Sequence, residues 1–131
     1  ISKAVANDLS YTLATYSTSS TAYIKFLLSS DGTTWTTGNF NNDNLKFSVD
    51  TWHHIAVTYE GSNMKCYIDG NYYSSTDIAY SGGIHSGAAD VLIADDYTKN
   101  KDFLGSIDDV RIYDRALDQN EIQELYNLRN P

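Results

Sequence analysis

The chain contains one cysteine, one methionine and one proline among its 131 residues. Because Cys66 is the only cysteine, no internal disulfide can form. No metal-binding or redox spacing surrounds it. Cys66 shares the alternation of Met64 and Ile68, which predicts a small, buried and unreactive side chain.

The chain also lacks an initiating methionine and a signal peptide, so we expect a piece of a longer protein or a processed product. No apolar run approaches the length of a membrane span, which predicts no insertion into a membrane. Basic residues are few. Nine lysines and arginines against seventeen acidic residues give a net charge of −8, which excludes a phosphate backbone as the expected partner.

What the sequence does contain indicates one globular domain over residues 1–131. Hydrophobic residues make up 41%, and this length is enough to bury a core. Eleven of the seventeen aromatic residues are tyrosines, which suit strands and half-exposed binding surfaces. Together with abundant Ser, Thr and Asn, this composition predicts an all-β protein that acts outside the cell or at its surface.

Short alternating runs separated by turn signals predict the strands of an antiparallel sandwich. Asp31–Gly32 and Asp69–Gly70 mark turns, and the second pair is the stronger hairpin signal because both central residues of a type I′ turn need positive φ. Polar loops are expected at 38–44, 81–87 and 95–102. The predicted strands are 11–16, 22–28, 33–36, 45–49, 53–59, 64–68, 71–78, 91–94 and 103–113.

One short helix is expected near the C-terminus. Asp118 and Glu121 have the spacing of a capping box, and Leu117 and Ile122 that of a hydrophobic staple. Ile122 begins an apolar stripe on one helical face, so we expect this helix to pack against the sandwich.

Two segments resemble a known family. Residues 50–70, DTWHHIAVTYEGSNMKCYIDG, and 105–127, GSIDDVRIYDRALDQNEIQELYN, are similar to the central hairpin and the terminal strand and helix of laminin-G-like jelly-roll domains, within the concanavalin A-like lectin/glucanase superfamily. The resemblance implies a two-sheet antiparallel jelly roll. The family's usual leading strands find no counterpart, so we expect an uncovered sheet edge that could pair with another chain.

Asp108 stands out in the predicted strand 103–113. Strict alternation turns it to the same side as Val110 and Ile112, and a buried carboxylate needs a partner. The resemblance implies a structural Ca²⁺ at this position. The alternatives are backbone N–H donors, an ion pair with Arg111 or Arg115, or a bulge that turns Asp108 outward.

A second acidic cluster lies in the loop 95–102. Asp95, Asp96 and Asp102 supply hard oxygen ligands, so this loop is a weaker candidate for Ca²⁺. Most acidic loops are merely solvated.

Catalysis is not expected. A retaining glycosidase needs two carboxylates about 5 Å apart. The chain has only three glutamates, Glu60 in a turn and Glu121 and Glu124 on the helix, and nothing resembles the glucanase E-x-D-x-x-E strand. The three histidines have no matched nucleophile or metal-ligand spacing.

The sequence therefore predicts a non-catalytic binding and adhesion module whose partners are glycans or surface proteins. Aromatic faces and amide or carboxylate side chains suit sugars, and the candidates gather in two loop regions. The alternative is a structural module that binds protein and is completed by strand addition. The candidate ligand-binding residues are Trp35, Phe40, Asn41, Asn42, Asp43, Tyr97 and Asn100.

Overall fold

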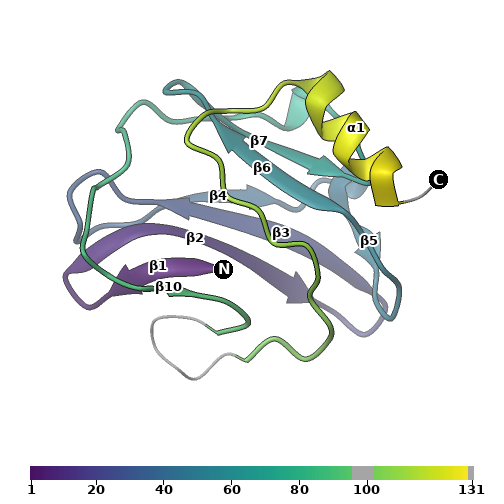
Figure 1. Ribbon diagram of the computed structural model, residues 1–131, viewed down its shortest axis with the longest axis horizontal. Coiled ribbons are helices and arrows are strands. Elements are labelled where there is room, and N and C mark those ends of the chain that lie inside the picture. Colours follow the sequence, from purple (N-terminus) through teal and green to yellow (C-terminus); the bar gives the residue numbers. More distant parts are fainter. Residues whose placement is uncertain (96–101, 130–131) are drawn as a thin grey trace.

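The computed structural model describes residues 1–95 and 102–129, which form two antiparallel sheets and one α-helix (Figure 1). The larger sheet has the order β10-β1-β2-β3-β4, with β5 paired to β3. Its six strands are β1 (Ser2–Val5), β2 (Asp8–Ser17), β3 (Thr21–Leu28), β4 (Thr36–Phe40), β5 (Phe47–Ser48) and β10 (Val91–Leu92).

The smaller sheet has the order β6-β7-β8, with β9 paired to β7. Its four strands are β6 (Ile55–Tyr59), β7 (Asn63–Ile68), β8 (Asn71–Tyr72) and β9 (Ile78–Ala79). Two 3-10 turns, η1 (Asp43–Leu45) and η2 (Ser74–Thr76), lie in connections, and α1 (Gln119–Arg129) closes the described chain. This architecture confirms the predicted all-β sandwich with one short C-terminal helix.

The core lies between the two sheets and follows from strand alternation. In β3 every second residue from Ala22 to Leu28 is at most 7% exposed, as predicted. From the other sheet, Met64, Cys66 and Ile68 of β7 belong to the same apolar cluster. Each large side chain buried in this way contributes roughly 1.5–3 kcal/mol. Burial also raises the pKa of the Cys66 thiol to about 12, which agrees with the prediction of an unreactive cysteine.

The Asp69–Gly70 turn joins β7 to β8 and contacts the helix α1. Asp69 and Gly70 have φ values of 52° and 74°, so the predicted left-handed turn is confirmed. Gln119 Nε2 donates to the Gly70 carbonyl at 2.7 Å. A Cβ on Gly70 would lie 2.8 Å from Gln123 Nε2, so a larger residue there would displace the Gln123 side chain and would be strained at this positive φ.

The capping box at the start of α1 is also confirmed. Asp118 Oδ1 accepts the Glu121 N–H at 3.0 Å, and Glu121 Oε2 accepts the Asp118 N–H at 2.9 Å. Ile122 is fully buried, so the apolar face of α1 packs against the sandwich as expected.

Three strand predictions near the turns need correction. The hairpin β1–β2 starts at Ser2, because Asn7 turns the chain at φ 62°, whereas the sequence predicted a first strand only over 11–16. The strand predicted over 33–36 lies instead at β4, since Asp31 Oδ1 accepts the N–H groups of Thr33 and Thr34 at 2.8 Å and keeps them from a ladder. The strand predicted over 71–78 is divided by η2 into β8 and β9.

The predicted strand 103–113 is wrong. This segment runs as an irregular, largely exposed chain toward α1 (Figure 1). Asp109 has φ 52°, which breaks the alternation, and Asp108 Oδ1 accepts the Asp109 N–H at 2.8 Å. Asp108 is therefore exposed and does not face the core. The bond from the Asp109 N–H agrees with one of the alternatives, a backbone N–H donor.

Among the helices of the described chain, none has the length and apolar character needed to cross a membrane.

The contribution of Glu121 to the stability of the fold depends on pH. The Arg115 guanidinium, and then the Asp118 N–H, lower the pKa of Glu121 from 4.5 to about 2. A depressed carboxylate pKa stabilises the fold above the ordinary value, and this contribution is lost as the pH falls from about 4.5 to about 2. We expect Glu121→Gln to have a lower thermal midpoint than the wild type at pH 7. The difference between the two midpoints should become smaller as the pH falls from about 4.5 to about 2.

The measurement is the thermal midpoint from circular dichroism between pH 2 and pH 7. Glu124→Gln, on the exposed side of the same helix, is the matched control and should follow the wild type. A gap between Glu121→Gln and the wild type that stays constant with pH would contradict this role.

Candidate functional site

The first group of predicted ligand-binding residues does not form one site. Trp35 precedes β4 and Asn41 follows it. Six residues of extended chain span about 20 Å, so these two residues lie at opposite ends of the strand. Phe40 is 1% exposed and packs in the core. Its ring offers no face to a ligand, and the prediction for Phe40 is wrong.

Asn42 and Asp43 have local roles at η1. Asn42 Oδ1 accepts the Asn44 N–H at 3.0 Å, and Asp43 pairs with Lys46 at 2.7 Å. Both side chains are exposed, so their predicted contact with a ligand stays a prediction. The predicted residues Tyr97 and Asn100 lie outside the described residues.

Asp108 and the loop 95–102 are the two predicted calcium sites. Within residues 1–95 and 102–129, no group of three or more His, Cys, Asp or Glu side chains could hold a metal ion. Asp95 lies next to the undescribed segment that contains Asp96, and Asp102 is exposed on its other side. Ca²⁺ binding at Asp108 and Ca²⁺ binding by the 95–102 loop both stay predictions.

Two tyrosines lie side by side on the outer face of the larger sheet. Tyr16 of β2 pairs with Tyr23 of β3, and their ring centroids are 5.8 Å apart at an interplanar angle of 23°. Tyr23 faces away from the core because its neighbours Ala22 and Ile24 face inward. Lys25 Nζ lies 3.9 Å from the centre of the Tyr16 ring, a cation–π contact that holds this ring in place.

Asparagines continue this surface onto β4. Asn39 pairs with Lys25, and Asn41 follows two residues later with the same alternation. Both asparagines are exposed, and Tyr16 is 37% exposed. We call Tyr16, Tyr23, Lys25, Asn39 and Asn41 the tyrosine face. Of these residues the sequence predicted only Asn41. The alternation of β3, whose apolar residues face inward, could have placed Tyr23 and Lys25 on the outer face. Tyr16 could not have been found in this way, because it lies beside Tyr23 only through the β2–β3 register.

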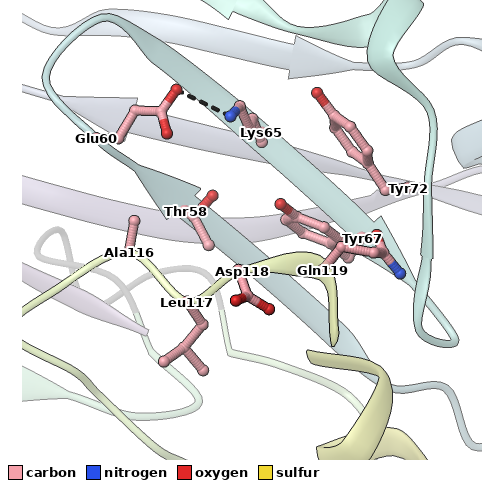
Figure 2. A pocket seen from close by; sticks show the side chains of 9 residues that line it. All are labelled: Thr58, Glu60, Lys65, Tyr67, Tyr72, Ala116, Leu117, Asp118 and Gln119. Atoms are coloured by element: carbon pink, nitrogen blue, oxygen red, sulfur yellow. Dashed lines mark ion pairs between the residues drawn. The ribbon is translucent and has the colours of Figure 1, made fainter. Parts of the chain in front are cut away.

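A groove of about 250 Å³ lies on the outer side of the smaller sheet (Figure 2). The connection to α1 forms one wall and β6, β7 and β8 form the other. The sequence did not predict it. Its lining side chains are those of Thr58, Glu60, Lys65, Tyr67, Tyr72, Ala116, Leu117, Asp118 and Gln119.

Several polar groups of this groove are engaged with one another and with the chain nearby, whereas the buried Gln119 Oε1 has no hydrogen-bond partner among the described residues. Lys65 Nζ pairs with Glu60 Oε1 at 2.8 Å, and the Tyr72 hydroxyl donates to Asp77 at 2.8 Å. Tyr67 is 3% exposed, so its ring presents no stacking surface. Asp118 caps α1, as described above. We interpret the groove as the joint between helix and sheet.

A third polar arrangement surrounds His53. Asp69 Oδ2 accepts from His53 Nδ1 at 2.8 Å, so His53 Nε2 can accept from the hydroxyls of Thr51 at 2.9 Å and Ser48 at 3.1 Å. Asp69 Oδ1 also accepts the His54 N–H at 2.9 Å. We call these contacts the Asp69 brace.

The brace follows the carboxylate–imidazole–hydroxyl order of a catalytic triad. However, Nε2 is shared between two hydroxyls that also bond to each other at 2.7 Å. These bonds tie β5, the loop after it and the β7–β8 turn together. They give His53 a structural role.

The comparisons with known proteins agree with this architecture. The profile of a laminin G family, described as the concanavalin A-like lectin/glucanases superfamily, matches residues 2–123. The chain belongs to this superfamily. The match confirms the resemblance and extends it over β1, β2 and β3, where the sequence motifs carried less of it.

One solved structure is similar to this laminin-G-like domain. It is a crystal structure of an S-layer domain-containing protein from Clostridium thermocellum, with 25% sequence identity and a TM-score of 0.47. The match covers 79% of the present chain and 51% of that protein, so the domain spans about half of the crystallised length. No curated protein sequence matches the domain significantly.

We expect the Asp69 brace to stabilise the laminin-G-like domain measurably. Asp69→Ala removes two bonds to a charged acceptor and places alanine at positive φ, which should cost about 3 kcal/mol of unfolding free energy. Asp69→Asn tolerates the left-handed conformation and keeps one acceptor oxygen, so its loss should be smaller.

Urea denaturation monitored by tryptophan fluorescence measures both changes. Asp43→Ala, which removes one exposed ion pair, is the matched control and should leave the stability unchanged within error. Equal stability of Asp69→Ala and the wild type would show that the brace does not hold these elements together.

Proposed function

We propose that this domain is a non-catalytic binding module that acts outside the cell or at its surface and recognises glycans on the tyrosine face. Membership of the lectin-containing superfamily supports the class of function. The observation that carries the proposal is the stack of exposed Tyr16 on half-buried Tyr23, with exposed asparagines on the neighbouring strand.

The chemistry of the tyrosine face suits a sugar ring. A sugar presents an apolar C–H face and a periphery of hydroxyls. The Tyr16 ring already contacts Lys25 and Tyr23, so the pair offers its remaining apolar surface, and the amides of Asn39 and Asn41 can both donate to and accept from hydroxyls. Because the face belongs to three paired strands, a ligand would meet side chains whose spacing the sheet already fixes.

The disposition of the glutamates supports a binding role without catalysis. Glu60 is paired with Lys65, and Glu121 with Arg115 at the start of α1. Glu124 is exposed on the helix. A glycosidase needs two opposed carboxylates at a sugar site, whereas these three are distributed over a turn and a helix.

Tyr23→Ala tests the proposal. We expect it to reduce glycan binding at least tenfold, because it removes half of the stacked pair. The measurement is binding of the isolated domain to a glycan array, followed by calorimetry with the strongest binder. Tyr73→Ala is a control, since Tyr73 is 37% exposed, as Tyr16 is, but lies outside the tyrosine face.

An array on which the wild type binds no glycan would contradict the proposal. So would equal binding by the wild type and Tyr23→Ala.

A second candidate function is recognition of protein through an uncovered edge. Among the described residues β6 pairs only with β7, and the segment 103–113 exposes apolar side chains, with Leu104 at 95% and Ile112 at 58%. Free edges and exposed apolar residues favour association.

This candidate predicts that the isolated domain self-associates in size-exclusion chromatography with light scattering. The double variant Leu104→Ser, Ile112→Ser should then elute as a monomer. A monomeric wild type at high concentration would count against association through this segment.

A further inference from the structure

Among the described residues, Trp52 is the largest side chain that is exposed to solvent. Its exposed fraction is 69%, although tryptophan has much apolar area to bury. Trp52 does not belong to the tyrosine face. The residues next to it, Thr51 and His53, have structural roles in the Asp69 brace.

The backbone on both sides of Trp52 is fixed. Thr51 and His53 belong to the Asp69 brace, whose bonds to Ser48 and Asp69 lie between 2.7 and 3.1 Å. Asp50 turns the chain at φ 61°. An exposed aromatic ring on a braced loop loses little freedom when it binds, so Trp52 is preorganised for contact.

The loop of Trp52 lies beside the tyrosine face. Ser48 of β5 pairs with Thr21 of β3, so it lies on the same side of the sheet as Thr21 and Tyr23. Thr51 bonds to Ser48, which brings the loop over this end of the sheet. Trp52 follows Thr51 in the chain, and Tyr23 lies two residues after Thr21 in β3.

We propose that Trp52 is a second aromatic subsite for the glycan that the tyrosine face binds. This inference rests on the proposed function. Because Trp52 belongs to a loop and the tyrosines belong to the β2–β3 pair, the ligand class is an oligosaccharide that contacts the tyrosines at one ring and Trp52 at another. His53 is a positioning residue, since it holds the loop without facing the ligand.

The test is an array that carries mono-, di-, tri- and tetrasaccharides of glucose, galactose, mannose and N-acetylglucosamine. We expect Trp52→Ala to bind tri- and tetrasaccharides about tenfold more weakly and monosaccharides as the wild type does. Trp52→Phe should restore most of the loss. In the Trp35→Phe protein, where Trp52 is the only tryptophan, a bound tetrasaccharide should shift the fluorescence and a monosaccharide should not.

The outcomes separate the two proposals. Glycan binding that is lost in Tyr23→Ala but unchanged at every length in Trp52→Ala overturns the Trp52 subsite alone. A loss in Trp52→Ala that is equal for mono- and tetrasaccharides overturns it too, because Trp52 would then belong to the first subsite. A wild type that binds nothing on the array overturns both proposals. A thermal midpoint equal to that of the wild type verifies that each variant is folded.

Discussion

The inward packing of β3 against β7 is the interaction on which the other features depend. Residues of β3 alternate, so burying Ala22, Ile24 and Phe26 against the opposite sheet commits Tyr23 and Lys25 to the outer surface. A slip of one residue in this strand would bury a lysine and expose the core. The β2–β3 register then brings Tyr16 beside Tyr23. The proposed ligand surface is thus a direct consequence of how the core is made.

The two outer faces of the sandwich differ because the helix packs against only one of the two sheets. On the smaller sheet, α1 docks on the Asp69–Gly70 turn, and the connection before it closes over β6 and β7. Several polar groups that line the remaining groove form hydrogen bonds or ion pairs of their own. On the larger sheet, the tyrosine face presents the exposed Tyr16 and the exposed amides of Asn39 and Asn41. Asp69 contributes to both features. Its turn contacts α1, and its carboxylate accepts hydrogen bonds that hold the loop of Trp52.

Much of the fold could be predicted because local signals were strong. Alternation located β3, β6 and β7, a DG pair located the β7–β8 turn, and the Asp118–Glu121 spacing located α1. Other features depended on information that the sequence pattern does not carry. β1 buries Ser2 and Ala4, whose small side chains give no hydrophobic alternation. The segment 103–113 alternates convincingly, yet the left-handed Asp109 and local hydrogen bonds of its aspartates override the pattern.

The candidate site could be predicted only in part, since it is assembled across strands. Asn41 was found through loop chemistry, but its neighbours on the face come from the pairing of β2, β3 and β4. Trp35, grouped with it in sequence, lies at the far end of β4, and Phe40 between them points inward. Residue type alone could not separate these positions, because the direction of each side chain is set by register.

The most direct test of the tyrosine face is an NMR titration of the ¹⁵N-labelled domain with the strongest oligosaccharide from the array. The account predicts that the largest chemical-shift changes cluster at Tyr16, Tyr23, Lys25, Asn39 and Asn41. Changes confined to the groove around Tyr67 and Tyr72, with the tyrosine face unaffected, would contradict it.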